Sequence, residues 1–274
     1  MESVLRLMVP LLASAGVENP LLDAQVLLSH ALKVQRHQLI LDHRRKVPAA
    51  LYRSVEGLIK RRLGGEPVAY LTGRKEFYGL EFFVTRDVLI PRPETELLVD
   101  LSIFHAPPGG RLLDLGTGSG AIAISVKHAR PDLEVSASDV SDAALRVARG
   151  NCRRLLKRNA VRFSMGDMYS PFTGRRFDII VSNPPYVDLA MKNSLARELS
   201  FEPPIALYAG NGGTGLISML IGGAARHIED GGILLLEIDP AHVRIVRDQA
   251  EFNGFTVSLF SDYAGLTRAA ALKK

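Results

Sequence analysis

The chain has 274 residues, 47% of them hydrophobic and 23% charged, an ordinary composition for a globular protein with a sizeable core. Its single cysteine, Cys152, excludes an intrachain disulfide framework and a cysteine-rich metal site. The seven histidines show no ligand spacing such as His-Glu-x-x-His, so we predict no metal site. The net charge is +5, and residues 1–90 carry +4 of it, with 13 Lys and Arg against 9 Asp and Glu.

The N-terminal segment, MESVLRLMVPLLASAG, is apolar at helical spacing, but Arg6 interrupts it and no basic leading region precedes it. We therefore expect a helix of a soluble bundle rather than a signal peptide. No apolar run approaches the ~20 residues that a membrane-spanning helix needs. A cytoplasmic protein with no membrane partner is expected.

Residues 1–74 are predicted to form a small helical domain. NPLLDAQVLLSHALK offers Asn19 as a cap and Pro20 at the first helical position, and AALYRSVEGLIKRRLGG ends in Gly64-Gly65. The basic residues of this region, in HRRK (43–46) and KRR (60–62), fit either a solvated helix face or a docking surface for an acidic partner or nucleic acid. We favour the solvated face.

Residues 75–90, KEFYGLEFFVTRDVLI, are rich in aromatic and β-branched residues on both sides of Gly79, which predicts a linking β-hairpin. From residue 91 to 274, strand and helix patterns alternate. The predicted strands are RLLDL, LEVSASD, VRFSM, FDIIVS, GGILLLE and FTVSLFS. This alternation indicates an α/β domain with a mostly parallel sheet and helices on both faces.

A glycine loop, DLGTGSG (114–120), follows the first predicted strand of this domain and opens a helix. Open α/β sheets bind ligands at the carboxyl ends of their strands, and glycines let a ligand approach the backbone closely. The loop has no Gly-Lys-Ser/Thr and is not a P-loop. Asp139 ends the next strand and can accept both ribose hydroxyls of a nucleoside. The alternative is a tight turn without a ligand.

These residues resemble the class I methyltransferases, which have a Rossmann-like, seven-stranded sheet and bind S-adenosyl-L-methionine, releasing S-adenosyl-L-homocysteine. The resemblance implies that the ribose lies against Asp139 and the adenine near Asp167 and Met168. A polarisable methionine can cover the face of a ring. The methionine part of the cofactor would lie along the loop formed by Gly116, Thr117, Gly118, Ser119 and Gly120.

The motif Asn183-Pro184-Pro185-Tyr186 directly follows the strand FDIIVS, which places it at the carboxyl edge of the sheet. A planar NH2 group is a poor nucleophile, so an enzyme that methylates it must orient the nitrogen and stabilise the charge that develops there. The Asn183 side-chain oxygen and the Pro184 carbonyl can each accept one N–H. Tyr186 can wall the pocket, and Asn183 also has an NH2 donor that could reach the cofactor or a substrate carbonyl. A plain strand-ending turn is the alternative.

Asn-Pro-Pro-Tyr alone leaves a nucleic-acid base or a glutamine amide open as the methyl acceptor. The segment EPVAYLTGRKEFYGLEFFVTRDVLIPRPETELLVD (66–100) resembles the hallmark segment of the HemK/PrmC family, most specifically at IPRPETE (90–96). That family methylates the N5 amide nitrogen of glutamine in the Gly-Gly-Gln motif of class I peptide chain release factors. The resemblance implies the same protein substrate and no stable nucleic-acid binding, with the N-terminal domain docking the substrate.

For the substrate cleft, we expect walls from Asn183, Pro184, Pro185, Tyr186 and the segment 91–96. Phe77 is a further candidate, with packing between domains as its alternative. The chain departs from the family at Asp239, where glycine is usual, and in DYAGLTR (262–268). A ribosomal-protein glutamine methyltransferase, a DNA or RNA amino-methyltransferase, and a non-enzymatic cofactor-binding module stay open as alternatives.

Overall fold

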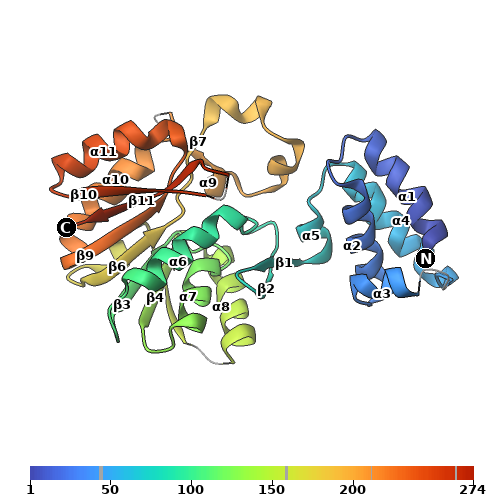
Figure 1. The fold of residues 1–274 in the computed structure, drawn as a ribbon, viewed down its shortest axis with the longest axis horizontal. Coiled ribbons are helices and arrows are strands. Elements are labelled where there is room, and N and C mark those ends of the chain that lie inside the picture. The colour runs from blue at the N-terminus through green and yellow to red at the C-terminus, as the bar shows by residue number, and fades with distance from the viewer. Residues whose placement is uncertain (43–45, 158–159, 211, 263) are drawn as a thin grey trace. The chain divides into compact units, whose positions relative to one another are not determined.

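The computed structural model describes residues 1–42, 46–157, 160–210, 212–262 and 264–274, and the chain divides into two units (Figure 1). Unit 1 consists of Met1–Arg74 together with the short segment Ala196–Phe201. Unit 2 consists of Lys75–Leu195 and Glu202–Lys274. The sequence pattern did not indicate that a segment from the second half of the chain belongs to unit 1.

Unit 1 is a helical bundle whose core is formed by the apolar faces that the sequence predicted. Leu12, Leu27, Leu28 and Leu39 are almost fully buried in it. Asn19 stands at the expected cap position, although its side chain accepts no capping hydrogen bond. The helices are α1 (Glu2–Ser14), α2 (Pro20–Leu32), α3 (Arg36–Leu41), α4 (Ala49–Leu63) and α5 (Val68–Thr72), with the short η4 (Arg197–Phe201).

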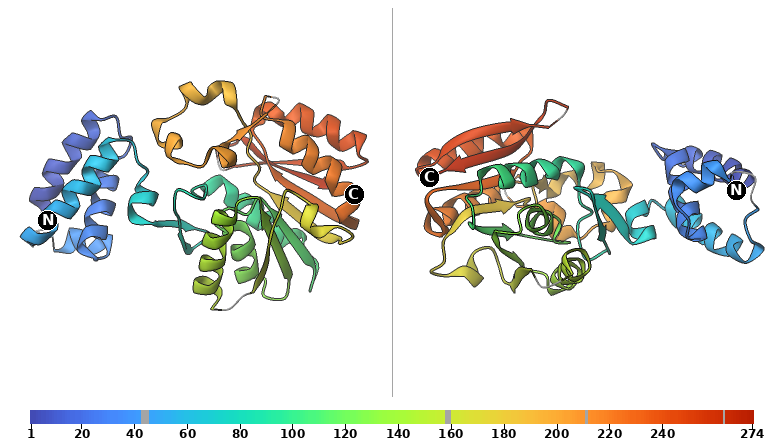
Figure 2. Two further views of the ribbon diagram at one scale, coloured as in Figure 1. Left: turned by 180° about the vertical axis from the view of Figure 1, so that it is seen from behind. Right: turned by 60° about the horizontal axis from the view of Figure 1, so that its bottom comes forward.

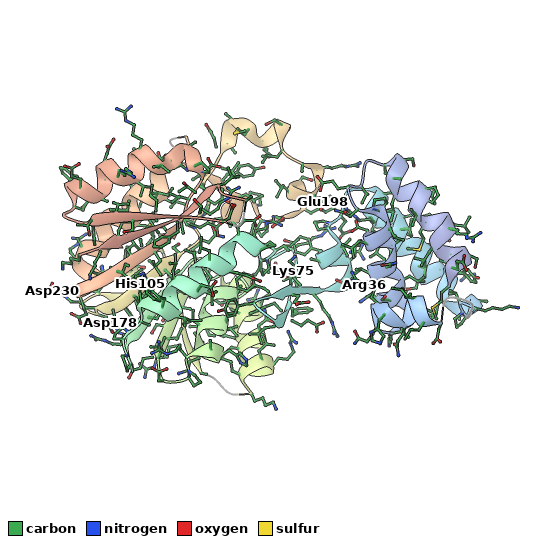
Figure 3. All side chains as sticks on the ribbon, in the orientation of Figure 1. Arg36, Lys75, His105, Asp178, Glu198 and Asp230 are labelled. Atoms are coloured by element: carbon green, nitrogen blue, oxygen red, sulfur yellow. The ribbon has the colours of Figure 1, made fainter. Side chains whose placement is uncertain are left out.

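In the basic cluster at 60–62, Lys60 and Arg61 are exposed, as a solvated face requires, and only Arg62 departs from that expectation. Arg62 is only 5% exposed, and its guanidinium donates to Asp23 at 2.7 Å and to Glu198 at 2.6 Å. Glu198 is labelled in Figure 3. Arg61 pairs with Glu66 at 2.7 Å, while Lys60 pairs with Glu56 at the surface. Residues 43–45 of the other basic cluster lie outside the described residues.

A two-stranded sheet of β1 (Arg74–Phe77) and β2 (Leu80–Phe83) lies where the hairpin was predicted, but it ends at residue 83, and residues 84–90 form no strand. The turn between the strands contains Tyr78 and Gly79, both at positive φ. Tyr78 is held in this conformation by its backbone N–H, which donates to Glu96 Oε1 at 2.7 Å, and by its hydroxyl, which donates to Asp100 at 2.7 Å.

The central sheet of unit 2 has seven strands over the described residues, in the order β10-β11-β9-β6-β3-β4-β5. The strands β5, β4, β3, β6 and β9 are parallel neighbours, and β11 is antiparallel to both β9 and β10. Six of the strands match the predicted ones, and β11 is the addition. Their bounds are β3 (Arg111–Leu115), β4 (Glu134–Asp139), β5 (Val161–Met165), β6 (Phe177–Ser182), β9 (Ile228–Glu237), β10 (Thr256–Ser261) and β11 (Thr267–Lys273).

Helices cover both faces of this sheet (Figure 2). Successive residues of a strand point to opposite faces, so apolar side chains on both faces have to be buried. Leu112 packs with α6 (Glu96–His105), α7 (Ala121–Ala129) and α8 (Asp142–Leu156). Leu113, the next residue, packs on the other face with α10 (Gly215–His227) and α11 (Val243–Phe252). The fold is therefore the expected α/β arrangement.

Short elements connect the strands near the carboxyl edge of the sheet. They are η1 (Pro93–Thr95), η2 (Ser170–Phe172), β7 (Val187–Asp188), η3 (Leu189–Ser194), α9 (Pro204–Leu207), β8 (Tyr208–Ala209) and η5 (Pro240–His242). Asp239, the departure from the family pattern, caps η5 by accepting the Ala241 N–H at 2.8 Å. Within the described part of the chain, no helix has the length and apolarity needed to cross a bilayer.

Candidate active site

The glycine loop runs from the end of β3 to the start of α7 and opens onto a pocket. Gly116 and Gly118 have φ values of 71° and 55°, and a Cβ added to either would meet no atom within 4 Å. These two backbone positions therefore face space that a ligand can fill. Gly120 serves packing instead, because a Cβ there would lie 2.7 Å from Ile124 Cδ1.

Asp114 supports the loop from beneath. Its Oδ2 accepts the Thr117 hydroxyl at 2.7 Å and the Ala123 N–H at 3.1 Å, which ties the loop to the first turn of α7. Oδ1 is buried and has no hydrogen-bond partner among the described residues. Burial raises the pKa of this carboxyl to about 7.

Asp139 ends β4 beside the loop, as predicted, and lines the same pocket. Its two carboxylate oxygens accept the backbone N–H groups of Gly118 and Ser141, each at 2.9 Å. Burial raises its pKa above the ordinary value, while these hydrogen bonds favour the charged form. Each carboxylate oxygen retains a lone pair, so Asp139 can still accept ribose hydroxyls.

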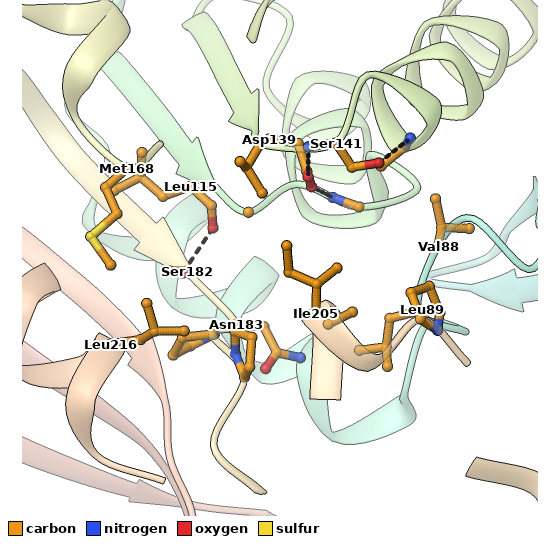
Figure 4. A pocket seen from close by; sticks show the side chains of 18 of the residues that line it. Val88, Leu89, Leu115, Asp139, Ser141, Met168, Ser182, Asn183, Ile205 and Leu216 are labelled. Atoms are coloured by element: carbon orange, nitrogen blue, oxygen red, sulfur yellow. Dashed lines mark hydrogen bonds between the residues drawn. The ribbon is translucent and has the colours of Figure 1, made fainter. Parts of the chain in front are cut away.

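The pocket lies within unit 2 at the carboxyl edge of the sheet and has a volume of about 320 Å³. Figure 4 shows Asp139 and Ser141 on one side, Asn183 on the other, and Met168 at one end. Met168 has a φ of 43°, a strained value for a residue with a side chain. The lining also includes Val88, Leu89, Leu115, Gly116, Gly118, Val140, Ala144, Asp167, Pro184, Pro185, Pro203, Ile205, Ala206, Leu216 and Leu220.

Asn183 follows β6 directly, and β6 is parallel to its neighbours β3 and β9. The ends of β3 and β6 are joined because the Ser182 hydroxyl donates to the Leu115 carbonyl at 2.8 Å (Figure 4). Asn183 and Pro184 therefore reach the same pocket as the glycine loop and Asp139. The Asn183 amide nitrogen donates to Thr95 Oγ1 at 3.0 Å, and its amide oxygen has no partner among the described residues.

A buried carboxylate lies behind the Asn-Pro-Pro-Tyr motif. Glu237, the last residue of β9, is 2% exposed. Its Oε2 accepts the Thr95 hydroxyl at 2.6 Å, and its Oε1 accepts the Tyr186 hydroxyl at 3.3 Å. Burial raises the pKa of Glu237, and burial together with the Glu237 charge raises the pKa of Tyr186. Thr95, Asn183, Tyr186 and Glu237 therefore form one hydrogen-bonded group.

The segment IPRPETE (90–96) frames this site by tying separate parts of unit 2 together. Arg92 pairs with the buried Glu202, which also accepts the Ile90 N–H at 3.1 Å. Thr95 bonds to Glu237 and Asn183, and Glu96 holds the Tyr78 backbone. The motif that resembled a family signature therefore positions the pocket walls rather than lining the pocket itself.

Some predicted site residues lie outside the pocket lining. Phe77 is 1% exposed and packs edge-on against Phe82, with ring centroids 6.0 Å apart. It is therefore a core residue and does not form a wall of the substrate cleft. Thr117, Ser119 and Gly120 shape the loop without lining the pocket. Tyr186 reaches Glu237 behind the motif.

Sequence reasoning missed Glu237 altogether, and it included Thr95 only as a member of the segment 91–96, without its contacts to Asn183 and Glu237. The sequence could have indicated Glu237, because this acidic residue ends a buried strand at the same edge of the sheet as Asp139 does. The apolar lining from α9 and α10, including Ile205 and Leu216, carried no such signal. Among the described residues, no cluster of three or more His, Cys, Asp or Glu is placed to hold a metal ion.

Two family models match separate stretches of the chain. Residues 3–73 match the model of the PrmC N-terminal domain, and residues 93–210 match the methyltransferase small domain. The release factor glutamine methyltransferase of Neisseria gonorrhoeae is 42% identical over 91% of this chain and 92% of its own. The enzyme of that name from Burkholderia pseudomallei is 43% identical over 91% and 90%.

A solved structure of a methyltransferase from Pyrococcus furiosus has the same fold, with a TM-score of 0.55 at 20% identity. The match covers 81% of this chain and 98% of that one.

Proposed function

Because this chain belongs to the release factor glutamine methyltransferase family, we propose that it methylates the glutamine of the Gly-Gly-Gln motif in class I peptide chain release factors. The methyl group goes to the side-chain amide nitrogen, N5. The observation that carries the proposal is that Asn183 and Pro184 share one pocket with the glycine loop and Asp139. Methyl donor and acceptor can therefore meet there.

S-adenosyl-L-methionine is the cofactor, and when bound it supplies a methyl group on a positively charged sulfur. The residues present fit such a molecule. Gly116 and Gly118 offer open backbone, and Asp139 offers carboxylate oxygens for the ribose. The largely apolar walls, with Met168 among them, suit a flat base.

Asn183 and Pro184 orient the reacting amide. The amide oxygen of Asn183 accepts one N–H of the substrate NH2 group, and the Pro184 carbonyl accepts the other. Both bonds strengthen as the nitrogen becomes positive, so they favour the transition state over the ground state. Correct orientation contributes up to ~7 kcal/mol. The nitrogen loses its proton after the new N–C bond has formed, so no residue has to remove it first.

The release factor is the proposed protein partner, and unit 1 is proposed to dock it. Unit 1 corresponds to the family's N-terminal domain and carries exposed apolar side chains at Leu7 and Leu11, one helical turn apart on α1. A partner that works in translation implies a cytoplasmic site of action. We propose no stable binding of nucleic acid.

Methyl transfer from labelled S-adenosyl-L-methionine tests the function. The full chain is incubated separately with a class I release factor, the same factor with its Gly-Gly-Gln glutamine replaced, a ribosomal protein and nucleic acid. We expect label on the unaltered release factor alone. Label on the ribosomal protein or nucleic acid alone would replace the proposal with one of those substrates. Cofactor binding without transfer to any of them would favour a binding module.

A further inference from the structure

We propose that Glu237 is a positioning residue that sets, through Thr95, which end of the Asn183 amide faces the substrate. The inference rests on the proposed function, in which the Asn183 oxygen accepts a substrate N–H. It concerns residues from three separate segments of the chain that meet behind the pocket: η1, the residue directly after β6, and the end of β9. Glu237 itself does not line the pocket.

The direction of each hydrogen bond follows from the donor groups available. A carboxylate can only accept, and a threonine hydroxyl has a single proton to donate. The Thr95 hydroxyl donates that proton to Glu237 Oε2, with the two oxygens 2.6 Å apart. Its oxygen must therefore act as an acceptor toward Asn183, at 3.0 Å. Only the NH2 end of the Asn183 amide can donate to it, which leaves the amide oxygen for the substrate.

The reverse orientation would disable the site. If Thr95 could donate to the Asn183 oxygen, the amide would present its NH2 group to the substrate NH2 group. Two donors would then face each other, and the developing positive charge on the substrate nitrogen would meet a positive dipole end. Because the two ends of an amide have the same shape, packing alone does not exclude this arrangement.

Sheet geometry explains why Glu237 can serve this purpose. In the parallel pair of β6 and β9, Ser182 is in register with Leu236, so the next residues along, Asn183 and Glu237, lie side by side at the carboxyl edge of the sheet. Thr95 is the last residue of η1, immediately before α6, and it is 4% exposed. Water therefore has little access to the hydroxyl, and Glu237 is its acceptor.

Three variants test the chain of contacts: Thr95→Val, Thr95→Ser and Glu237→Leu. Valine keeps the shape of threonine but removes the hydroxyl, whereas serine keeps the hydroxyl. We expect kcat on release factor to fall ~10- to 100-fold in Thr95→Val and Glu237→Leu, since ~1.4 kcal/mol corresponds to a factor of 10. The Kd for S-adenosyl-L-homocysteine should stay within ~3-fold of wild type in both, and Thr95→Ser should retain most of the kcat.

The double variant Thr95→Val/Glu237→Leu distinguishes positioning from separate contributions. If Glu237 acts through Thr95, its kcat should equal that of Glu237→Leu within ~2-fold, because both changes break one chain of contacts. Losses that multiply would overturn the proposal, as would a wild-type kcat in Thr95→Val. Circular dichroism and the melting temperature of each variant show whether it folds, and Thr95→Ser provides a test if Thr95→Val does not.

Failure of this inference is distinct from failure of the proposed function. If the wild-type chain labels no release factor, the proposed function is wrong and the variants are not the cause. If the wild-type chain labels release factor and Thr95→Val does so at the same rate, only the positioning role of Glu237 is wrong.

Discussion

Arg62 of α4 donates to Glu198 at 2.6 Å, although 136 residues separate the two in the chain. The same guanidinium donates to Asp23 of α2 at 2.7 Å and is only 5% exposed. A buried cation between two carboxylates is stable because each charge has a partner, and removing one partner leaves another charge uncompensated. This contact makes residues 196–201 part of the helical unit.

Replacing Arg62 with alanine should destabilise unit 1 by about 3 kcal/mol, because Asp23 would be left partly buried without its cation. The free energy of unfolding, followed by urea denaturation, measures this change. Lys60→Ala provides a matched control on the same helix, since Lys60 pairs with Glu56 at the exposed surface. We expect no measurable loss there, and an equal loss in both variants would contradict the role of Arg62.

Asn183→Ala should lower kcat on release factor by ~100- to 1,000-fold, the usual effect of losing one group that stabilises charge in a transition state. Affinity for S-adenosyl-L-methionine should change little, because the glycine loop and Asp139 line the pocket independently of the Asn183 side chain. Steady-state kinetics and calorimetric titration measure the two effects. Turnover like that of wild type would refute the assigned role.

Asp139→Asn should weaken cofactor binding by ~10- to 100-fold, because hydrogen bonds to a charged acceptor contribute about 1.5–3 kcal/mol each. The matched control is Asp142→Asn. Asp142 is half exposed, begins α8 and pairs with Arg146 at the surface. Calorimetric titration with S-adenosyl-L-homocysteine should distinguish the two variants, and equal affinities would exclude Asp139 as a cofactor ligand.

Asp114 should make stability depend on pH. Burial raises its pKa to about 7 from an ordinary value of 3.8, so the folded state retains a proton that the unfolded chain has lost between these values. This contribution to stability is complete at low pH and is lost as pH rises toward 7, by up to ~1.4 kcal/mol per pH unit. In the variant Asp114→Asn, the side-chain amide cannot titrate, so this contribution is absent.

Urea denaturation without cofactor, at several pH values between roughly 5 and 8, measures this effect. The stability of Asp114→Asn relative to wild type should increase as pH rises from 5 to about 7 and should level off above that value. A constant difference between the two proteins would show that Asp114 does not titrate there.

Gly213→Ala should lower activity by displacing the motif. Gly213 has a φ of 85°, and a Cβ there would lie 2.2 Å from the Tyr186 carbonyl oxygen. Gly254 is the matched control, since its φ is 77° and a Cβ would meet no atom within 4 Å. Both substitutions carry about 1 kcal/mol of backbone strain. We therefore expect kcat to fall in Gly213→Ala and to stay unchanged in Gly254→Ala. Equal kcat values in the two variants would show that Tyr186 tolerates the shift.

Local patterns were sufficient to predict much of unit 2. The alternation of strands and helices predicted the sheet, and the strand ends at Asp139 and Asn183 placed both residues at its carboxyl edge. β11 was not named from its own pattern, because TRAAALK is rich in alanine, which favours helices over strands. The neighbouring β9 and β10 impose the strand through pairing.

Contacts between distant segments could not be predicted from spacing. Thr95 and Asn183 lie in two separate motifs and Glu237 ends a buried strand, and only the tertiary fold brings their side chains together. Phe77 shows the opposite case, since an aromatic residue in a hairpin suits a cleft wall and a core equally well. Its burial against Phe82 depends on tertiary packing, which the alternation of side chains along a strand does not reveal.

The composition of unit 1 affects how such enzymes can be recombined. Part of this unit is encoded downstream of the Asn-Pro-Pro-Tyr motif, in residues 196–201, so it is not an independent module that a simple gene fusion could add or remove. A chimera that exchanged residues 1–74 alone would set a foreign side chain at the position of Arg62 against the original Glu198. Exchange of substrate preference between relatives should therefore require both segments to be transferred together.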